Sequence, residues 1–237
     1  MNVTKDKISS VFFQYSIPAV LGMLAISSAN IVDGFFIGNY VGDFGLAAIN
    51  ISFPIFSLLF GFALMLAIGS SVVSGKLIGQ GDIKSASIIF SKTMVCITLF
   101  SFITCTGLFL NIETVLYLFG ADENLTKIAI EYLSVILIFI PFLMIGVVLD
   151  YFVRVDNRPN LAFIALLFSA VINVILDWFL IVYLQKGIFG AALATGISQL
   201  ALIFILLPHF FSKKATLKFV KPIGSYIQIL KASYNGA

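Results

Sequence analysis

The chain has 237 residues, of which 60% are hydrophobic and only 11% are charged, and its formal net charge is +3. Soluble domains carry about 25% charged residues, so this composition excludes an ordinary soluble globular domain. The small net charge does not indicate a nucleic-acid partner, and none is expected. Lipid is therefore the expected solvent for most of the surface.

Apolar segments that are long enough to cross a bilayer recur six times: residues 11–37, 47–74, 87–110, 129–153, 161–184 and 188–211. Each exceeds the roughly 20 residues that a helix needs to span the hydrocarbon core. Gly- and Pro-containing runs of this length do not resemble the short alternating strands of a membrane barrel. The sequence therefore predicts an all-α, polytopic membrane protein with six transmembrane helices in the lipid bilayer.

The first apolar segment is too long for the hydrophobic part of a cleavable signal peptide, so we expect it to remain as a span. Cys96 and Cys105 both lie in the third segment. On a helix they would be about 13 Å apart along the axis, which is too far for a disulfide.

Lysine and arginine residues are divided unequally between the two sets of loops. One side carries ten, namely Lys5, Lys7, Lys76, Lys84, Arg154, Arg158, Lys213, Lys214, Lys218 and Lys221, and the other carries only two, Lys127 and Lys186. Cytoplasmic loops are enriched in these residues. We therefore expect a multi-pass protein of the plasma membrane with both termini in the cytoplasm.

The chain divides into three predicted parts. Residues 1–211 form a lobe of six transmembrane helices. Residues 212–226 form a polar and basic cytoplasmic connector, in which Pro222 and Gly224 oppose a long helix. Residues 227–237 become apolar again but are too few to span a membrane, so they are expected to be the truncated start of a seventh helix.

Ionisable side chains inside spanning helices cost about 2.5–3.5 kcal/mol each at the helix centre. In the predicted orientation, Asp33 lies about 6 Å below the outer end of the first span, and Asp177 and Thr195 lie about 10 Å below the outer ends of the fifth and sixth. Asn173 precedes Asp177 by one helical turn and shares its face. These oxygen-bearing groups suit a hard cation such as Na⁺ or a shared proton. Unrelated packing hydrogen bonds are the alternative.

We interpret the remaining polar residues of the spans, and the proline in the first span, as structural. Pro18 removes a backbone hydrogen bond from the first span and so allows a kink 15 residues before Asp33. Asp150 and Arg154 are spaced for an i,i+4 contact. Lys92 is expected to extend its ammonium group to water, and His209 is expected at the membrane interface.

A series of motifs runs from Pro18 to Gln199 in a fixed order: Val32-Asp33-Gly34 with Phe35-Phe36-Ile37-Gly38, then Pro54, Gly75 to Asp82, Phe152-Val153-Arg154 with Asn157, Asn173 to Asp177, and Gly187 to Thr195. Together these motifs resemble the N-terminal half of multidrug and toxic compound extrusion (MATE) transporters of the bacterial and archaeal branch. The end of the chain, from Ser233 to Ala237, resembles the opening of the family's seventh helix.

The resemblance implies one lobe of a twelve-helix transporter whose two six-helix lobes are related by a pseudo-two-fold axis. Such transporters are not enzymes, use no cofactor, and export small cationic or amphipathic drugs in exchange for Na⁺ or H⁺. The family's N-lobe cation site corresponds to Asp33, Asn173, Asp177 and Thr195, the set that spacing also indicates. The substrate cavity lies between lobes, so transport would need a missing C-terminal lobe or a second copy.

Three alternatives stay open. A related flippase for lipid-linked saccharides would require a strongly cationic cavity, whereas the spans here contain mainly carboxylates. An intramembrane aspartyl protease would carry Tyr-Asp and Gly-x-Gly-Asp motifs, but Asp33 follows Val32 and Asp177 follows Leu176, which argues against that class. The third alternative is a fragment without function of its own.

Overall fold

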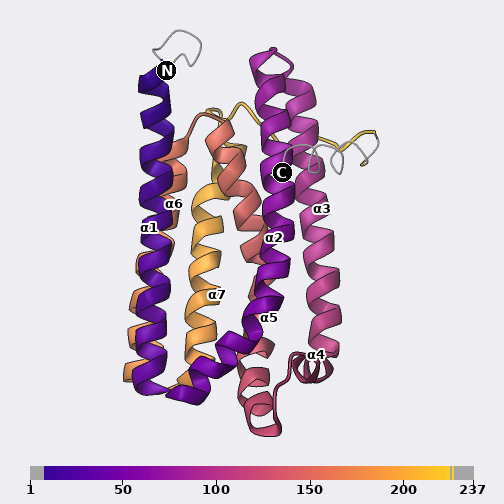
Figure 1. Cartoon of the computed structure of the whole chain (residues 1–237). Helices are drawn as coiled ribbons and strands as arrows, with labels where there is room; N and C mark the ends of the chain where they lie inside the picture. Colours follow the sequence, from indigo (N-terminus) through magenta and orange to yellow (C-terminus); the bar gives the residue numbers. More distant parts are fainter. Residues whose placement is uncertain (1–7, 225, 227–237) are drawn as a thin grey trace.

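The computed structural model describes residues 8–224 and 226, and their secondary structure is helical (Figure 1). The elements are α1 (Ile8–Tyr40), α2 (Asp43–Gly79), α3 (Ile83–Leu110), α4 (Ile112–Leu118), α5 (Glu123–Val155), α6 (Pro159–Asp177), the π-helical η1 (Trp178–Tyr183), α7 (Gly187–Leu206) and the 3₁₀-helical η2 (Leu207–Phe211). The predicted seventh-helix start at 227–237 lies outside the described residues.

Six helical stretches of the described chain are long and apolar enough to cross a membrane, which confirms the predicted six spans. The helices extend past most predicted limits because polar residues at their ends continue the helical backbone. The short helix α4 was not predicted, since its seven residues form only about two turns. Lys76, Lys84 and Arg154 lie at one end of the bundle in this topology, and Lys127 and Lys186 lie at the other.

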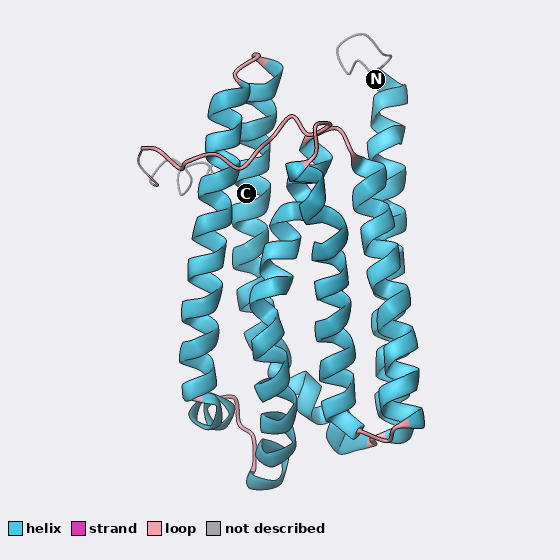
Figure 2. Cartoon of the chain, turned by 180° about the vertical axis from the view of Figure 1, so that it is seen from behind, coloured by secondary structure: helices cyan, strands magenta, loops and turns pink. Residues whose placement is uncertain are grey.

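Helix α5 forms the centre of the bundle. It packs against α2, α3 and α7, while α1 packs mainly against α6, and the two views show α1 paired with α6 at one side of the bundle (Figures 1 and 2). Leu133, Ile136, Ile140, Met144 and Val148 are all buried along α5. Their spacing of three or four residues places them on one face of the helix, which explains why this span is the most enclosed of the six.

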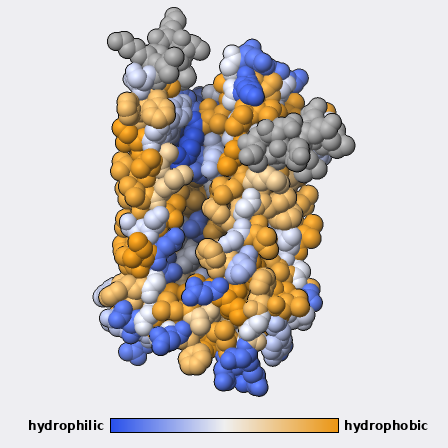
Figure 3. All heavy atoms as spheres, viewed as in Figure 1, coloured by the Kyte–Doolittle hydropathy of each residue, from blue (hydrophilic) through white to orange (hydrophobic). Residues whose placement is uncertain are grey.

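The surface matches a protein surrounded by lipid. Orange, hydrophobic residues cover most of the face shown in Figure 3, and blue, hydrophilic residues gather near the two ends of the bundle. Hydrophilic residues also line the hollow between α1 and α2 in this view. These residues interrupt a face that is otherwise mostly hydrophobic.

Aspartate caps begin two of the helices at the loops. The Asp82 carboxylate accepts a hydrogen bond from the Ser85 backbone N–H at 3.0 Å, and Asp122 does the same for Leu125 at 2.7 Å. The hydrogen bonds with Ser85 hold the pKa of the Asp82 carboxyl below its usual value. These caps satisfy N–H groups that the first helical turn leaves without a backbone partner.

The connector after η2 is extended and fixed to the lobe by the buried Asp156. This residue directly follows α5, and its carboxylate accepts hydrogen bonds from the backbone N–H groups of Thr216 and Leu217 at 2.9 and 3.1 Å. The Nε2 atom of His209 lies 2.5 Å from the same carboxylate. The expectation that His209 is an interfacial residue is therefore wrong: it is buried because Asp156 offers it a polar partner inside the fold.

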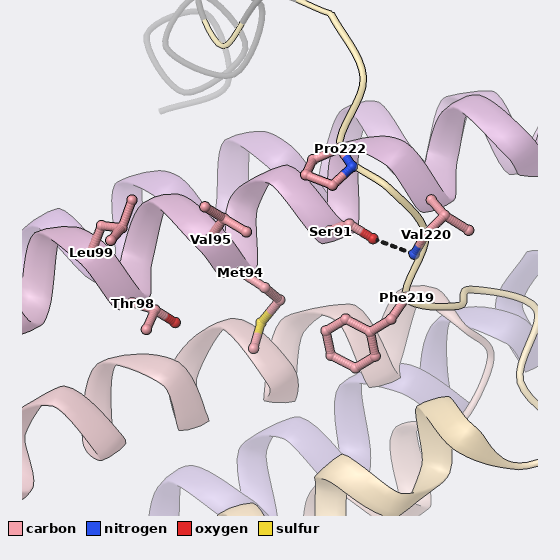
Figure 4. A pocket seen from close by; sticks show the side chains of 8 residues that line it. All are labelled: Ser91, Met94, Val95, Thr98, Leu99, Phe219, Val220 and Pro222. Atoms are coloured by element: carbon pink, nitrogen blue, oxygen red, sulfur yellow. Dashed lines mark hydrogen bonds between the residues drawn. The ribbon is translucent and has the colours of Figure 1, made fainter.

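Helix α3 holds the next part of the connector (Figure 4). The backbone N–H groups of Lys218 and Val220 donate to Ser87 Oγ at 3.3 Å and Ser91 Oγ at 2.9 Å. Between them the Phe219 ring packs on Phe90 with centroids 4.8 Å apart. A groove of about 360 Å³ remains between α3 and the connector, lined by residues that include Ser91 and Phe219.

Lys92 does not extend to water as expected. Only 2% of the residue is exposed, and its Nζ atom lies 5.8 Å from the centre of the Tyr226 ring. The connector crosses α3 at this level and covers the lysine, a tertiary contact that the position of Lys92 in its helix does not indicate.

Candidate cation site

Asp33 and Asp177 come together from two helices that are far apart in the sequence. Asp33 is near the end of α1 and Asp177 is the last residue of α6, and these two helices pack along each other. The two carboxylates lie close enough to interact electrostatically. The structure therefore brings together the two acidic residues that the sequence singles out.

Three carboxylate oxygens at this place are buried and have no hydrogen-bond partner among the described residues: Asp33 Oδ1, Asp177 Oδ1 and Asp177 Oδ2. Asp177 is 0% exposed. A buried polar group without a hydrogen bond costs about 1–3 kcal/mol, and buried polar groups are otherwise almost always paired. These oxygens are therefore available to a cation or a proton.

Thr195 reaches the same level from the third helix. A small apolar cluster joins Ile37 of α1, Ile181 of η1 and Ala191 of α7. Asp33 and Asp177 each precede their cluster residue by four positions. Thr195 follows Ala191 by four positions on a helix of opposite direction.

All three polar residues thus lie about one turn, or 6 Å, from the cluster on the same side. Thr195 is half-buried there. The positions of the three polar residues relative to the cluster support the common depth that was predicted from the helix lengths.

Asn173 and Tyr132 complete the polar surroundings. Asn173 is buried on α6, one turn before Asp177. Tyr132 is buried on α5 and interacts electrostatically with both Asp33 and Asp177. The predicted site did not include Tyr132, because that site comprised only two carboxylates, the Asn173 amide and the Thr195 hydroxyl. Depth would have found it, since Tyr132 lies nine residues, about 13 Å, into α5 from the same end of the bundle.

The π-helix η1 begins directly after Asp177. Single π-helical turns inside longer helices are rare and frequent at functional sites. In this chain η1 continues α6, and both elements contact α1 and α7. Asp177 therefore lies where the α-helical backbone of α6 changes to the π-helical backbone of η1. The apolar periodicity of the sequence did not reveal this change.

Helix α1 continues through Pro18 without interruption from Ile8 to Tyr40. The kink at Pro18 stays a prediction. Before the proline in the sequence, the Tyr15 hydroxyl donates to Asn157 Oδ1 at 2.7 Å. This hydrogen bond ties the N-terminal end of α1 to the turn between α5 and α6. Pro18 therefore lies between this anchored end and the end that carries Asp33.

The Asp150–Arg154 contact has the structural form that its spacing predicts. Arg154 Nε and Nη2 donate to Asp150 Oδ2 and Oδ1, each at 3.0 Å. This bidentate pair satisfies both carboxylate oxygens at the connector end of α5. It is separate from the site at Asp33 and Asp177.

The site offers two carboxylates, an amide and hydroxyls. The described residues contain no group of three or more His, Cys, Asp and Glu side chains placed to hold a metal ion. Two carboxylates supplemented by neutral oxygens suit a monovalent hard cation or an exchangeable proton. These groups have the chemistry that binding of one positive charge would require.

Sequence comparisons relate the chain to known exporters. A family model described as MatE matches residues 18–179. The multidrug export protein MepA of Staphylococcus saprophyticus is 28% identical over 235 residues, which cover 95% of this chain and 52% of that protein. MepA of Staphylococcus haemolyticus is 30% identical over 220 residues, which cover 89% and 47%. The chain thus spans about half the length of the curated relatives it matches.

Solved structures share the fold. An outward-facing multidrug resistance MATE family transporter superposes with a TM-score of 0.87 at 24% identity, over 94% of this chain and 49% of that one. A transporter of the MOP superfamily from Pyrococcus furiosus, described as having a binding pocket of reverse polarity, gives a TM-score of 0.85 at 24% identity with the same coverage of 94% and 49%. The six-helix arrangement is therefore that of half a transporter chain.

Proposed function

Because the chain belongs to the MatE family, which its match over residues 18–179 establishes, we propose that it is the N-terminal lobe of a secondary active multidrug exporter driven by Na⁺ or H⁺. The observation that carries the coupling is the set of three buried carboxylate oxygens of Asp33 and Asp177 that lack a hydrogen-bond partner. Binding of a cation or a proton would neutralise the site and supply that partner.

The proposed coupling element is α1. Its N-terminal end is anchored through Tyr15 and Asn157, its C-terminal end carries Asp33, and Pro18 lies between them. Neutralising Asp33 changes which position of the C-terminal part of α1 has the lower free energy, and the missing backbone hydrogen bond at Pro18 lets that part bend. Bending into the hollow between α1 and α2 would displace a bound drug.

The proposed substrate is a small amphipathic or cationic drug-like molecule. The relatives named MepA are described as multidrug export proteins. A cavity between lobes needs a partner, so we propose that the chain works with a C-terminal lobe or with a second copy of itself. The ten-to-two division of loop charges supports cytoplasmic termini for this lobe in the plasma membrane.

The charge distribution favours this proposal over a saccharide flippase. A flippase of this superfamily was expected to need a cationic cavity. Arg154 is paired with Asp150, and Lys92 is covered by the connector. The buried groups without hydrogen-bond partners among the described residues are instead two carboxylates and the Ser70 hydroxyl.

Cation-dependent thermal unfolding of the purified chain tests the coupling site. Saturating Na⁺, compared with equal choline chloride, should raise the unfolding temperature if Na⁺ is the coupling ion. A ligand at 100 times its Kd adds about 2.7 kcal/mol to the free energy of unfolding. If H⁺ couples, Na⁺ has no effect and the stabilisation follows acidification.

The variant Asp33→Asn should abolish either response. Asp43→Asn is the matched control, because Asp43 is exposed near the same end of the bundle. In a chain joined to a second lobe, Asp33→Asn should also abolish drug export while membrane insertion persists. Undiminished export by that variant would refute the coupling role of Asp33.

A further inference from the structure

One apolar contact closes the bundle at the end that carries the α1–α2 turn. Ile37 of α1, Ile181 of η1 and Ala191 of α7 are each at most 2% exposed and form one cluster. Val41, Leu46 and Ile49, from the turn and the start of α2, pack against this cluster. The three helices that carry Asp33, Asp177 and Thr195 are therefore joined by a buried contact about one turn beyond those residues.

Small residues on α7 make this contact unusually close. A Cβ atom on Gly190 would lie 3.1 Å from Leu180 Cβ and 3.2 Å from the Leu180 backbone carbon. Gly190 is next to Ala191, and Leu180 is next to Ile181. Helix α7 and η1 thus meet almost backbone to backbone, and larger side chains at Gly190 or Ala191 would force the helices apart.

We propose that Ile37, Ile181 and Ala191 form a cap that positions Asp33, Asp177 and Thr195 and seals them from the aqueous phase at the α1–α2 turn. This inference rests on the proposed function insofar as the three polar residues bind the coupling cation. A cation then reaches Asp33 and Asp177 from the hollow between α1 and α2 (Figure 3) and not through the loop end. The three cap residues are positioning residues and do not touch the ion.

The seal follows from the chemistry of the cluster. It contains apolar side chains only, and water or an ion crossing it would lose its hydrogen bonds or hydration without replacement. Because the cap is one turn away from the carboxylates, it excludes water without contributing a ligand. Movement of α1 away from η1 and α7 would break the cap and disperse the polar residues together.

Carboxylate modification measures the seal as an increase over the modification rate that access from the hollow between α1 and α2 already gives. The chain is placed in lipid nanodiscs, treated with a water-soluble carbodiimide and a nucleophile, and the modified fractions of Asp33 and Asp177 are measured by peptide mass spectrometry. The pair Ile37→Ala with Ile181→Ala should raise the modification rate about tenfold, which corresponds to about 1.4 kcal/mol less for opening. The controls Ile31→Ala on α1 and Ile175→Ala on α6 remove side chains that are 73% and 56% exposed and should leave the rate unchanged.

Milder and opposite variants keep the test decisive if the alanine pair does not fold. Ile37→Val with Ile181→Val removes one methyl group from each side chain and should raise the rate by a smaller factor. Ala191→Leu adds bulk, so it should separate the helices and abolish cation-dependent stabilisation. Folded valine and leucine variants that react at the parental rate would overturn the cap.

Failure of the cap and failure of the proposed function give different results. If the parent shows neither Na⁺- nor H⁺-dependent stabilisation but the cap variants react faster, the seal stands and the coupling function fails. If the parent is stabilised while the cap variants react at the parental rate and retain that stabilisation, the function stands and the cap is refuted.

Discussion

The Nε2 atom of His209 lies 2.5 Å from Oδ2 of Asp156. Asp156 also accepts hydrogen bonds from two connector N–H groups, so one buried carboxylate links the end of α5, η2 and the start of the connector. Charge-assisted hydrogen bonds of this kind are stronger than neutral ones. The first part of the connector is consequently a fixed part of the lobe.

Replacing Asp156 by alanine should release the connector. The change leaves two backbone N–H groups and an imidazole without their acceptor, and each buried unpaired group costs about 1–3 kcal/mol. We expect a lower unfolding temperature and faster cleavage by a lysine-specific protease at Lys218, whose N–H is held by Ser87. Glu123→Ala removes only an exposed pair with Lys127 and should change stability by less than about 1 kcal/mol. Parental cleavage of the Asp156→Ala variant would contradict the proposed attachment.

Tyr15→Phe should weaken the attachment of α1 without affecting its packing. It removes the hydroxyl that donates to Asn157 at 2.7 Å, and a neutral hydrogen bond contributes about 1 kcal/mol. The variant should unfold at a lower temperature, and amide hydrogen exchange should rise in the residues before Pro18. Tyr40→Phe, at the exposed end of the same helix, is the control. Equal effects of both variants would exclude a specific role for the Asn157 contact.

Hydropathy was sufficient to predict the six spans, because the length and apolar composition of a segment alone indicate whether its helix can span the hydrocarbon core. Local spacing was also sufficient for the Asp150–Arg154 pair, whose partners lie on one helix. For Asp33, Asp177 and Thr195, helix direction and depth gave a common level that the Ile37–Ile181–Ala191 register supports. These features depend on one helix at a time or on the alternation of helix directions.

Features that depend on contacts between distant segments could not be predicted from the sequence. His209 is buried because Asp156, 53 positions away, faces it, and Lys92 is covered by a connector that folds back on α3. The π-helix after Asp177 interrupts a continuous apolar run, so periodicity gave no sign of it. Depth alone suggests the level of Tyr132, but its proximity to the two aspartates arises only when α5 packs inside the bundle.

Gly196→Ala should be destabilising through a single partner. A Cβ atom at this position of α7 would overlap the ring of Phe139 on α5, and overpacking typically costs about 1–3 kcal/mol. Phe139→Leu should partly relieve the overlap, so the double variant should be more stable than the sum of the single effects predicts. Thermal unfolding of the four proteins measures this coupling. The control Gly61→Ala meets no atom within 4 Å and should be close to neutral.

Replacement of Asp177 or Asp150 by leucine should have opposite effects on stability if the Asp177 carboxylate binds a cation and does not stabilise the fold. Asp177→Leu removes two buried oxygens that have no partner among the described residues, so the free energy of unfolding in cation-free buffer should rise by about 1–3 kcal/mol. The response to the coupling ion should disappear in the same protein. Such a gain in stability with a loss of function is typical of a strained functional group.

Asp150→Leu is the matched comparison, because it breaks the bidentate contact with Arg154 and leaves a largely buried guanidinium group without its partner. It should lower the unfolding temperature. The two variants are compared by thermal unfolding in choline chloride at one pH. If Asp177→Leu destabilises the chain as Asp150→Leu does, the Asp177 carboxylate contributes to folding, and its unpaired oxygens do not identify a cation site.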